Sequence, residues 1–178
     1  LINAQHCDLI VFTGDLVTIQ ANELDGFMDQ LSQLSAPDGV MSIMGNHDYG
    51  MYQRRFTKAQ RRNDIKDLYR RQHDMGWQLL LNEHTSIHRG DDSLVIVGVE
   101  NDGTPPHFPR FADLKKAMHG IDEGAFQIML SHDPTHWRRS IIPETDVQLT
   151  LSGHTHAGQF KIFGWSPVTM VYKEWTDS

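Results

Sequence analysis

Four short apolar runs along the chain each end in a loop rich in Asp, Asn, His and Gly. The runs cover residues 8–12, 40–44, 126–130 and 147–151, and each has the length and composition of a buried strand. Because ligands in α/β folds bind beyond the carboxyl ends of the strands, four such loops from neighbouring strands predict one shared site. The loops are Thr13-Gly14-Asp15, Gly45-Asn46-His47-Asp48, Ser131-His132-Asp133-Pro134 and Ser152-Gly153-His154-Thr155-His156.

The rest of the chain adds helices and further strands between these runs. Helical spacing of apolar residues predicts helices over 23–34 and 58–75 and a short helix over 111–118. Strands are predicted over 77–81, 85–88 and 94–99, the last two as a hairpin. With 178 residues, of which 39% are hydrophobic, the chain is expected to form one α/β domain over residues 1–178. No apolar run is long enough to cross a bilayer, so we expect a soluble domain.

The net charge of −7 argues against general electrostatic binding to nucleic acid, which favours a basic surface. An acidic total does not exclude an anionic substrate, because bound metal ions reverse the local field. The cations of Arg54-Arg55, Lys58 and Arg61-Arg62 could contact a phosphate or an anionic head group, but a solvated helix face is the simpler interpretation. The single cysteine, Cys7, cannot form an internal disulfide.

The strand-end loops carry side chains of the types that bind divalent metals. Oxygen and imidazole ligands without thiolate suit Mn, Fe or Zn, and Mg is also compatible. On an extended loop, His154 and His156 would point in opposite directions and serve two metals, while Asp15 has two oxygens with which to bridge them. The candidate ligands are Asp15, Asn46, His132, His154 and His156, and the candidate catalytic residue is His47.

Two divalent metals about 3.5–4 Å apart clamp the attacking and leaving oxygens of an in-line displacement at phosphorus. The predicted reaction is therefore hydrolysis of a phosphomonoester or phosphodiester by a metal-bridging hydroxide, with His47 protonating the leaving alkoxide. Each motif alone also fits a turn or a helix start, but their joint occurrence after four strands favours the metal site. Two alternatives stay open: a hydrolase with one metal on Asn46, His132 and His154, and a catalytically impaired or non-catalytic fragment acting as a binding domain.

These motifs, in this order, resemble those of the calcineurin-like metallophosphoesterase family. The runs LSHDP (130–134) and LSGHTHAGQ (151–159) are similar to one bacterial branch. That branch includes phosphodiesterase-like, often membrane-anchored proteins, some of which act on lipid-linked or nucleotide phosphates. The resemblance implies a four-layer α/β/β/α sandwich with a dinuclear metal site at one edge.

The resemblance also implies a role for each candidate residue. His156 would hold the first metal, Asp15 would bridge both metals, and His47 would be the catalytic histidine. The second metal would be held by Asn46, His132 and His154. The implied substrate is a small-molecule or lipid-linked phosphate ester.

The sequence departs from the family pattern in three places. The family's first motif, Asp-x-His on an earlier strand, is absent, so the first metal has only Asp15 and His156 here. The family often places a second Asp three residues after the Gly-Asp pair, where this chain has Thr18, whose side chain is no carboxylate partner for His47. The family domain also runs on for several more strands after the His-x-His loop. We therefore expect a domain incomplete at both ends, and a membrane anchor or export signal would precede Leu1.

Overall fold

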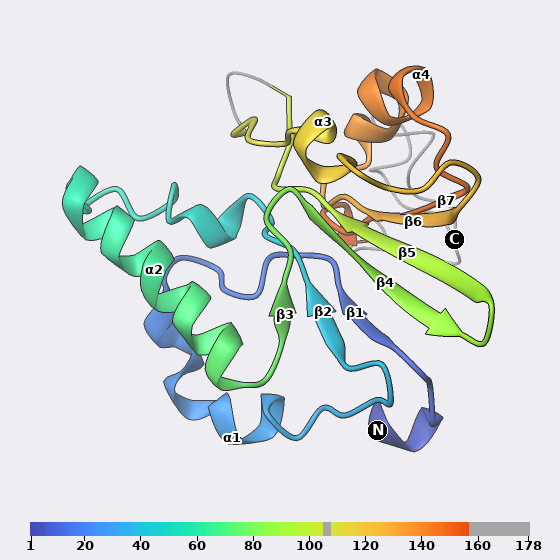
Figure 1. Ribbon diagram of the computed structural model, residues 1–178. Coiled ribbons are helices and arrows are strands. Elements are labelled where there is room, and N and C mark those ends of the chain that lie inside the picture. Colours follow the sequence, from blue (N-terminus) through green and yellow to red (C-terminus); the bar gives the residue numbers. More distant parts are fainter. Residues whose placement is uncertain (105–107, 157–178) are drawn as a thin grey trace, which may run out of the picture.

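The computed structural model describes residues 1–104 and 108–156, and in this part of the chain two sheets lie face to face (Figure 1). Sheet A is parallel and has the order β1 (Ile10–Phe12), β2 (Val40–Ser42), β3 (Gln78–Leu79). Sheet B has the order β4 (Glu83–Arg89), β5 (Asp92–Gly98), β6 (Phe126–Leu130), β7 (Leu149–Leu151). Strands β4 and β5 form the predicted antiparallel hairpin, and the pairs β5–β6 and β6–β7 are parallel.

Helices cover the outer face of each sheet. On the side of sheet A lie α1 (Met28–Leu31) and α2 (Lys58–Asp74), and on the side of sheet B lie α3 (Leu114–Ala117) and α4 (Ile142–Glu144) (Figure 1). Shorter turns complete the described part: the 3-10 helices η1 (Asn3–Gln5), η2 (Ala21–Gly26) and η3 (His47–Tyr49), and the π-helical η4 (Trp137–Ile141). Along the described ranges, no helix is both long and apolar enough to span a bilayer.

Alternation along the strands builds three hydrophobic interfaces between the four layers. Successive side chains of a strand point to opposite faces of its sheet. In β5, Ile96 packs with Met41 of β2 between the two sheets, whereas Val95 and Val97 pack against Leu114 on the outer face of sheet B. A third cluster joins α2 to the outer face of sheet A. The expected α/β/β/α sandwich is thereby confirmed, while the expected domain limits include residues 157–178, which lie outside the described part.

The predicted single helix over 23–34 is wrong. The segment forms the 3-10 helix η2 and then the short α1, with the backbone of Phe27 leaving helical geometry at φ −125°. Glu23 explains the tight first turn, because its carboxylate accepts hydrogen bonds from the backbone amides of Thr18, Ile19 and Gln20. The predicted helix over 58–75 is right to within one residue of α2.

Asn82 joins the two sheets, since it lies between β3 of sheet A and β4 of sheet B. It is buried and has a left-handed backbone with φ 56°. Its Oδ1 accepts from the amides of Glu100 and Asp113, and its Nδ2 donates to the Glu100 carboxylate and the Phe111 carbonyl. One side chain thus fixes the crossing between the sheets to the loop that follows β5.

Replacing Asn82 with Ala should lower the free energy of unfolding by about 3–5 kcal/mol, because it removes four hydrogen bonds and leaves the left-handed backbone to a residue that adopts it less readily than Asn. Asn82→Gly loses the same bonds but tolerates positive φ, so it should be about 1 kcal/mol less destabilised than Asn82→Ala. Urea denaturation of both variants measures the difference. A loss below about 1 kcal/mol in Asn82→Ala would contradict the role assigned to the hydrogen bonds.

Candidate metal centre

Four of the five predicted ligands come together where the carboxyl ends of β1 and β2 face those of β6 and β7. One ligand atom each from Asp15, His132 and His154 lies within 4.8 Å of the others. The Oδ1 atom of Asn46 is 3.1 Å from His132 Nε2 and 2.8 Å from His154 Nδ1. Each sheet therefore supplies two of the four side chains, and their role as metal ligands stays a prediction.

Glycines allow the loops to approach this closely. Gly14 and Asp15 both have left-handed backbones, with φ 95° and 59°, which turns the chain sharply after β1. A Cβ atom on Gly45 would overlap the Asp15 carboxylate and the His132 ring. Gly14 and Gly45, which precede Asp15 and Asn46, are thus required by the packing of the loops and have no chemical part of their own.

His132 is oriented by the loop that carries Asp15. It is 1% exposed, and its Nδ1 lies 2.7 Å from the carbonyl oxygen of Thr13. A carbonyl only accepts, so Nδ1 carries the proton and the lone pair of Nε2 is available for a cation. Nε2 faces Asp15 Oδ2 at 3.1 Å, within the cluster of ligand atoms. A backbone acceptor on the other ring nitrogen is how proteins commonly fix metal-binding histidines.

Asn46 is oriented by Tyr52, a residue that the sequence analysis did not single out. The Nδ2 of Asn46 donates to the Tyr52 hydroxyl at 2.8 Å, so that Oδ1 faces His132 and His154. The ring of Tyr52 also stacks on that of His47, with centroids 4.3 Å apart and planes inclined by 25°. Nothing in the sequence pattern distinguishes Tyr52 from an ordinary surface aromatic, because its two partners are known only from the fold.

His47 is fixed by backbone atoms. Its Nδ1 lies 2.7 Å from the carbonyl oxygen of Thr18, so Nδ1 carries the proton and Nε2 is the nitrogen that can exchange one. Its backbone amide donates to Asp15 Oδ1 at 2.9 Å. Thr18 therefore supplies an acceptor for the ring through its main chain, although its side chain is not the carboxylate that the family pattern often has there.

Asp48 ties the first two loops together and was also missed as a site residue. Its buried carboxylate accepts from the amides of Asp15 and Gly45 at 2.8 Å and from that of Val17 at 3.1 Å. Burial raises the pKa of Asp48 to about 6, against the lowering effect of these hydrogen bonds. The position directly after His47 was a visible signal, but Asp is equally common in turns.

The charges within the cluster favour an anionic Asp15 among neutral or cationic imidazoles. Burial raises the pKa of Asp15, but the hydrogen bond and charge of His132 outweigh it and the pKa lies below its usual value. Burial lowers the pKa of His132, yet the hydrogen bond to Asp15 leaves that pKa above its usual value. Burial holds the pKa of His154 below its usual value. Oxygen and imidazole lone pairs converging beside one carboxylate fit a divalent cation.

The expectation of an extended loop through His154 and His156 is wrong. Both residues have left-handed backbones, with φ 68° and 54°, so the alternation of an extended chain does not apply. The amide of Gly153 donates to the His132 carbonyl and that of Thr155 to the Gly153 carbonyl, which turns the loop tightly. His156 is exposed and lies outside the cluster of ligand atoms formed by Asp15, His132 and His154.

Two further side chains flank His154. The ring of Phe108 meets the His154 ring edge-on, with centroids 4.9 Å apart. Asp133 is buried, and its Oδ2 lies 3.9 Å from His154 Nε2 while its Oδ1 accepts from the amide and hydroxyl of Thr135. Asp133 thus bonds to Thr135 and also places a carboxylate beside a candidate ligand.

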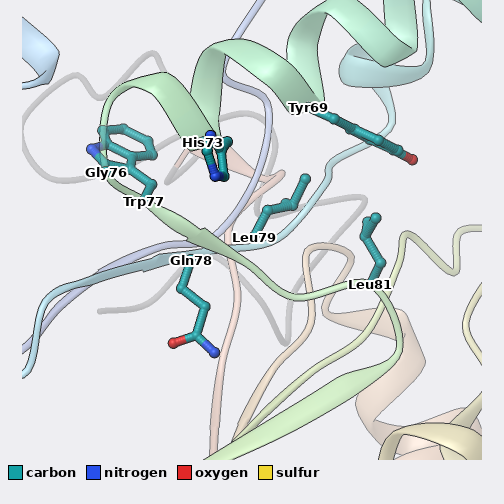
Figure 2. Close-up of a pocket in the computed structure, with 7 residues that line it drawn as sticks. All are labelled: Tyr69, His73, Gly76, Trp77, Gln78, Leu79 and Leu81. Atoms are coloured by element: carbon teal, nitrogen blue, oxygen red, sulfur yellow. The ribbon is translucent and has the colours of Figure 1, made fainter.

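A separate hollow lies at the C-terminal end of α2, and its lining includes none of the predicted site residues. Figure 2 shows its lining, which comes from the C-terminal part of α2 and from the edge strand β3. The lining residues are Tyr69, His73, Gly76, Trp77, Gln78, Leu79 and Leu81. The candidate site for chemistry therefore lies at the strand-end loops.

Comparison with known proteins finds one family over most of the chain. A family model described as calcineurin-like phosphoesterase matches residues 1–158. The chain is 30% identical over 169 residues to an uncharacterized metallophosphoesterase of Aquifex aeolicus (strain VF5), covering 93% of this chain and 57% of that protein. It is 30% identical over 176 residues to the uncharacterized metallophosphoesterase YkuE of Bacillus subtilis (strain 168), covering 94% and 53%.

A vertebrate relative is also similar. The transmembrane protein with metallophosphoesterase domain of Danio rerio is 29% identical over 164 residues, which is 89% of this chain and 35% of that protein. The chain thus spans between about a third and somewhat more than half of the length of these three relatives.

Proposed function

The chain belongs to the calcineurin-like phosphoesterase family, and on this premise we propose that it forms the metal-binding core of a hydrolase of phosphate esters. The observation that carries the proposal is the convergence of Asp15, Asn46, His132 and His154 from four loops and both sheets. A binding domain without chemistry has no need of such a donor set, nor of a histidine placed as His47 is.

The four clustered side chains would hold one divalent cation, with Asp15 free to share its second oxygen with another. The second cation would draw on Asp15 and His156, so the proposed pair of ions includes one site that the chain completes only in part. Mn, Fe or Zn suits these donors best, and Mg is compatible. When bound, such ions polarise the phosphoryl group and make water a nucleophile at neutral pH.

The chain's own residues position the substrate and move the proton. Thr13 fixes the tautomer of His132, and Tyr52 fixes the amide of Asn46, so that their lone pairs stay directed at the cluster. His47 keeps its Nδ1 proton on the Thr18 carbonyl and delivers a proton from Nε2 to the leaving oxygen of the ester. The stacked Tyr52 ring limits rotation of the His47 ring during this transfer.

We propose a phosphomonoester or phosphodiester, either a small molecule or a lipid-linked one, as the substrate. The name of the Danio rerio relative, a transmembrane protein, supports association of the longer protein with a membrane. The observation that His156 lies outside the ligand cluster favours a second form of the mechanism, in which one cation on Asn46, His132 and His154 suffices.

Replacing Asp15 with Ala should weaken binding of Mn²⁺ at least about 100-fold, because it removes the one carboxylate of the cluster, and a change outside the ligand shell already costs 10–100-fold. Calorimetric titration of the 178-residue chain measures this affinity and the number of ions bound. Asp91→Ala is the matched control, since Asp91 is an exposed aspartate on the β4–β5 turn.

The number of ions separates the alternatives. Two ions per chain support the dinuclear mechanism, one supports the single-metal form, and none supports the non-catalytic binding domain. Hydrolysis of an aryl phosphate diester by the full-length protein tests the chemistry itself. Undiminished hydrolysis in Asp15→Ala would refute the proposed function.

A further inference from the structure

The residues that follow the His47 loop form a concentrated positive charge in an acidic protein. Residues 49–63 contain no Asp or Glu, and five of the chain's 16 Lys and Arg residues lie within residues 54–62, here called the basic segment. Its cations are Arg54, Arg55, Lys58, Arg61 and Arg62. The sequence alone is compatible with a solvated helix face, and the structure adds three observations that favour a binding surface.

The first observation is that the cations of the basic segment are not neutralised. Among the residues that the structure describes, none of the five has a carboxylate within ion-pair distance, and Arg61 donates instead to the carbonyl oxygen of Gly50. Other arginines of the chain are paired: Arg70 and Arg71 with Asp67, and Arg139 with Asp102. Charge compensation is thus usual in this protein and is missing where the cations are densest.

The second observation is the place of the basic segment in the fold. It covers the loop before α2 and the first turns of that helix, which begins to one side of the sheets (Figure 1), and Arg61 within it donates to the carbonyl oxygen of Gly50, next to the His47 loop. An extended anionic surface could contact the four exposed cations of the segment at once.

The third observation is the exposed apolar pair Met51 and Tyr52, which precedes the basic segment and is 45% and 41% exposed. Cations beside exposed aromatic and apolar side chains suit the interface of a lipid bilayer, where the apolar parts enter the head-group region and the cations meet anionic lipids. The exposed apolar side chains beside the cations favour a bilayer over a nucleic acid, whose phosphate backbone has no apolar layer for them to enter.

We propose that the basic segment docks the protein on an anionic lipid bilayer. Arg54, Arg55, Lys58 and Arg62 have exposed side chains and would contact the head groups, with Met51 at the interface. Because Tyr52 hydrogen-bonds Asn46 and stacks on His47, docking here would place the candidate site beside the membrane surface. This inference concerns attachment and stands whether or not the chain hydrolyses phosphate esters.

Co-sedimentation of the 178-residue chain with vesicles tests the proposal. Binding is expected to vesicles of phosphatidylcholine with phosphatidylserine, not to phosphatidylcholine alone, and it should weaken with salt. The double variant Arg54→Gln, Arg62→Gln should bind about 30-fold more weakly, since each cation near the surface contributes about 1 kcal/mol. Its control is Lys66→Gln, Lys115→Gln, which removes two exposed cations elsewhere with the same change in net charge.

The outcomes are separable, because the substituted side chains are exposed and a thermal melt shows that each variant is folded. Equal binding to both kinds of vesicle, or none to either, would overturn the proposal. Equal weakening by the two double variants would overturn it as well, since net charge alone would then govern binding. Retention on single-stranded RNA without binding to vesicles would replace the bilayer with a nucleic acid.

Discussion

The full-length protein carrying His47→Ala should hydrolyse an aryl phosphate diester about 10²–10⁴-fold more slowly, the range that a positioned proton donor contributes. Its affinity for Mn²⁺ should stay unchanged, because the His47 ring bonds to the Thr18 carbonyl, stacks on Tyr52 and is not among the clustered ligand groups. The loss should be largest for esters with poor leaving groups, since these depend most on protonation of the leaving oxygen.

Two companion variants make the His47 result specific. His73→Ala removes an exposed histidine in the distant hollow and should leave the rate unchanged. Tyr52→Phe keeps the stacked ring but loses the hydroxyl that accepts from Asn46, so it should weaken metal binding more than it slows the loaded enzyme. A His47→Ala protein that retains the parent's rate would remove His47 from the mechanism.

Gly45→Ala should lower the free energy of unfolding by about 1–3 kcal/mol and weaken binding of Mn²⁺. The added methyl group would meet the Asp15 carboxylate and the His132 ring, so the first, second and third loops must separate to admit it. Chemical denaturation measures the loss of stability, and metal titration measures the separation of the ligands. Because Gly45 is not in the left-handed region, the effect is steric and not a matter of backbone strain.

The chain offers graded controls for this test. A Cβ on Gly26 would meet nothing within 4 Å, so Gly26→Ala should leave both stability and metal affinity close to those of the parent. A Cβ on Gly153 would come to 3.0 Å from Thr13 Oγ1, a milder contact that predicts an intermediate loss. If Gly45→Ala proves no more destabilised than Gly26→Ala, the close packing of the loops is not limiting.

The layered fold was predicted through the resemblance of the strand-end motifs to the family, and four of its strands, β1, β2, β6 and β7, are visible in the sequence as short apolar runs that end at polar loops. The limits of α2 agree with the prediction to within one residue, since Thr57 and Gln60 form a capping box that starts the helix. The single helix expected over 23–34 does not form, and the spacing of the apolar residues does not show why. Glu23 bonds backward to three amides, and this local competition tightens the first turn.

Some residues of the candidate site could likewise be predicted from the sequence, and others could not. Asp15, Asn46, His132 and His154 were visible because strand-end position and residue type are both read from sequence. Tyr52 acts through hydrogen bonding to Asn46 and stacking on His47, and Asp48 acts mainly through the amides of Asp15 and Val17, more than 30 positions away, so only the folded chain reveals these roles. The backbone of His154 and His156 could not be foreseen, because positive φ at histidine follows from the amide contacts of Gly153 and Thr155.

The division of the four clustered ligands between the sheets has a mechanical consequence. Asp15 and Asn46 follow strands of sheet A, and His132 and His154 follow strands of sheet B, so a cation held by all four fastens two layers that otherwise adhere through apolar packing. Separating the layers would then require release of the ion. At 100 times its dissociation constant the ion would add about 2.7 kcal/mol to the free energy of unfolding, so the candidate metal site would also hold the two layers of the fold together.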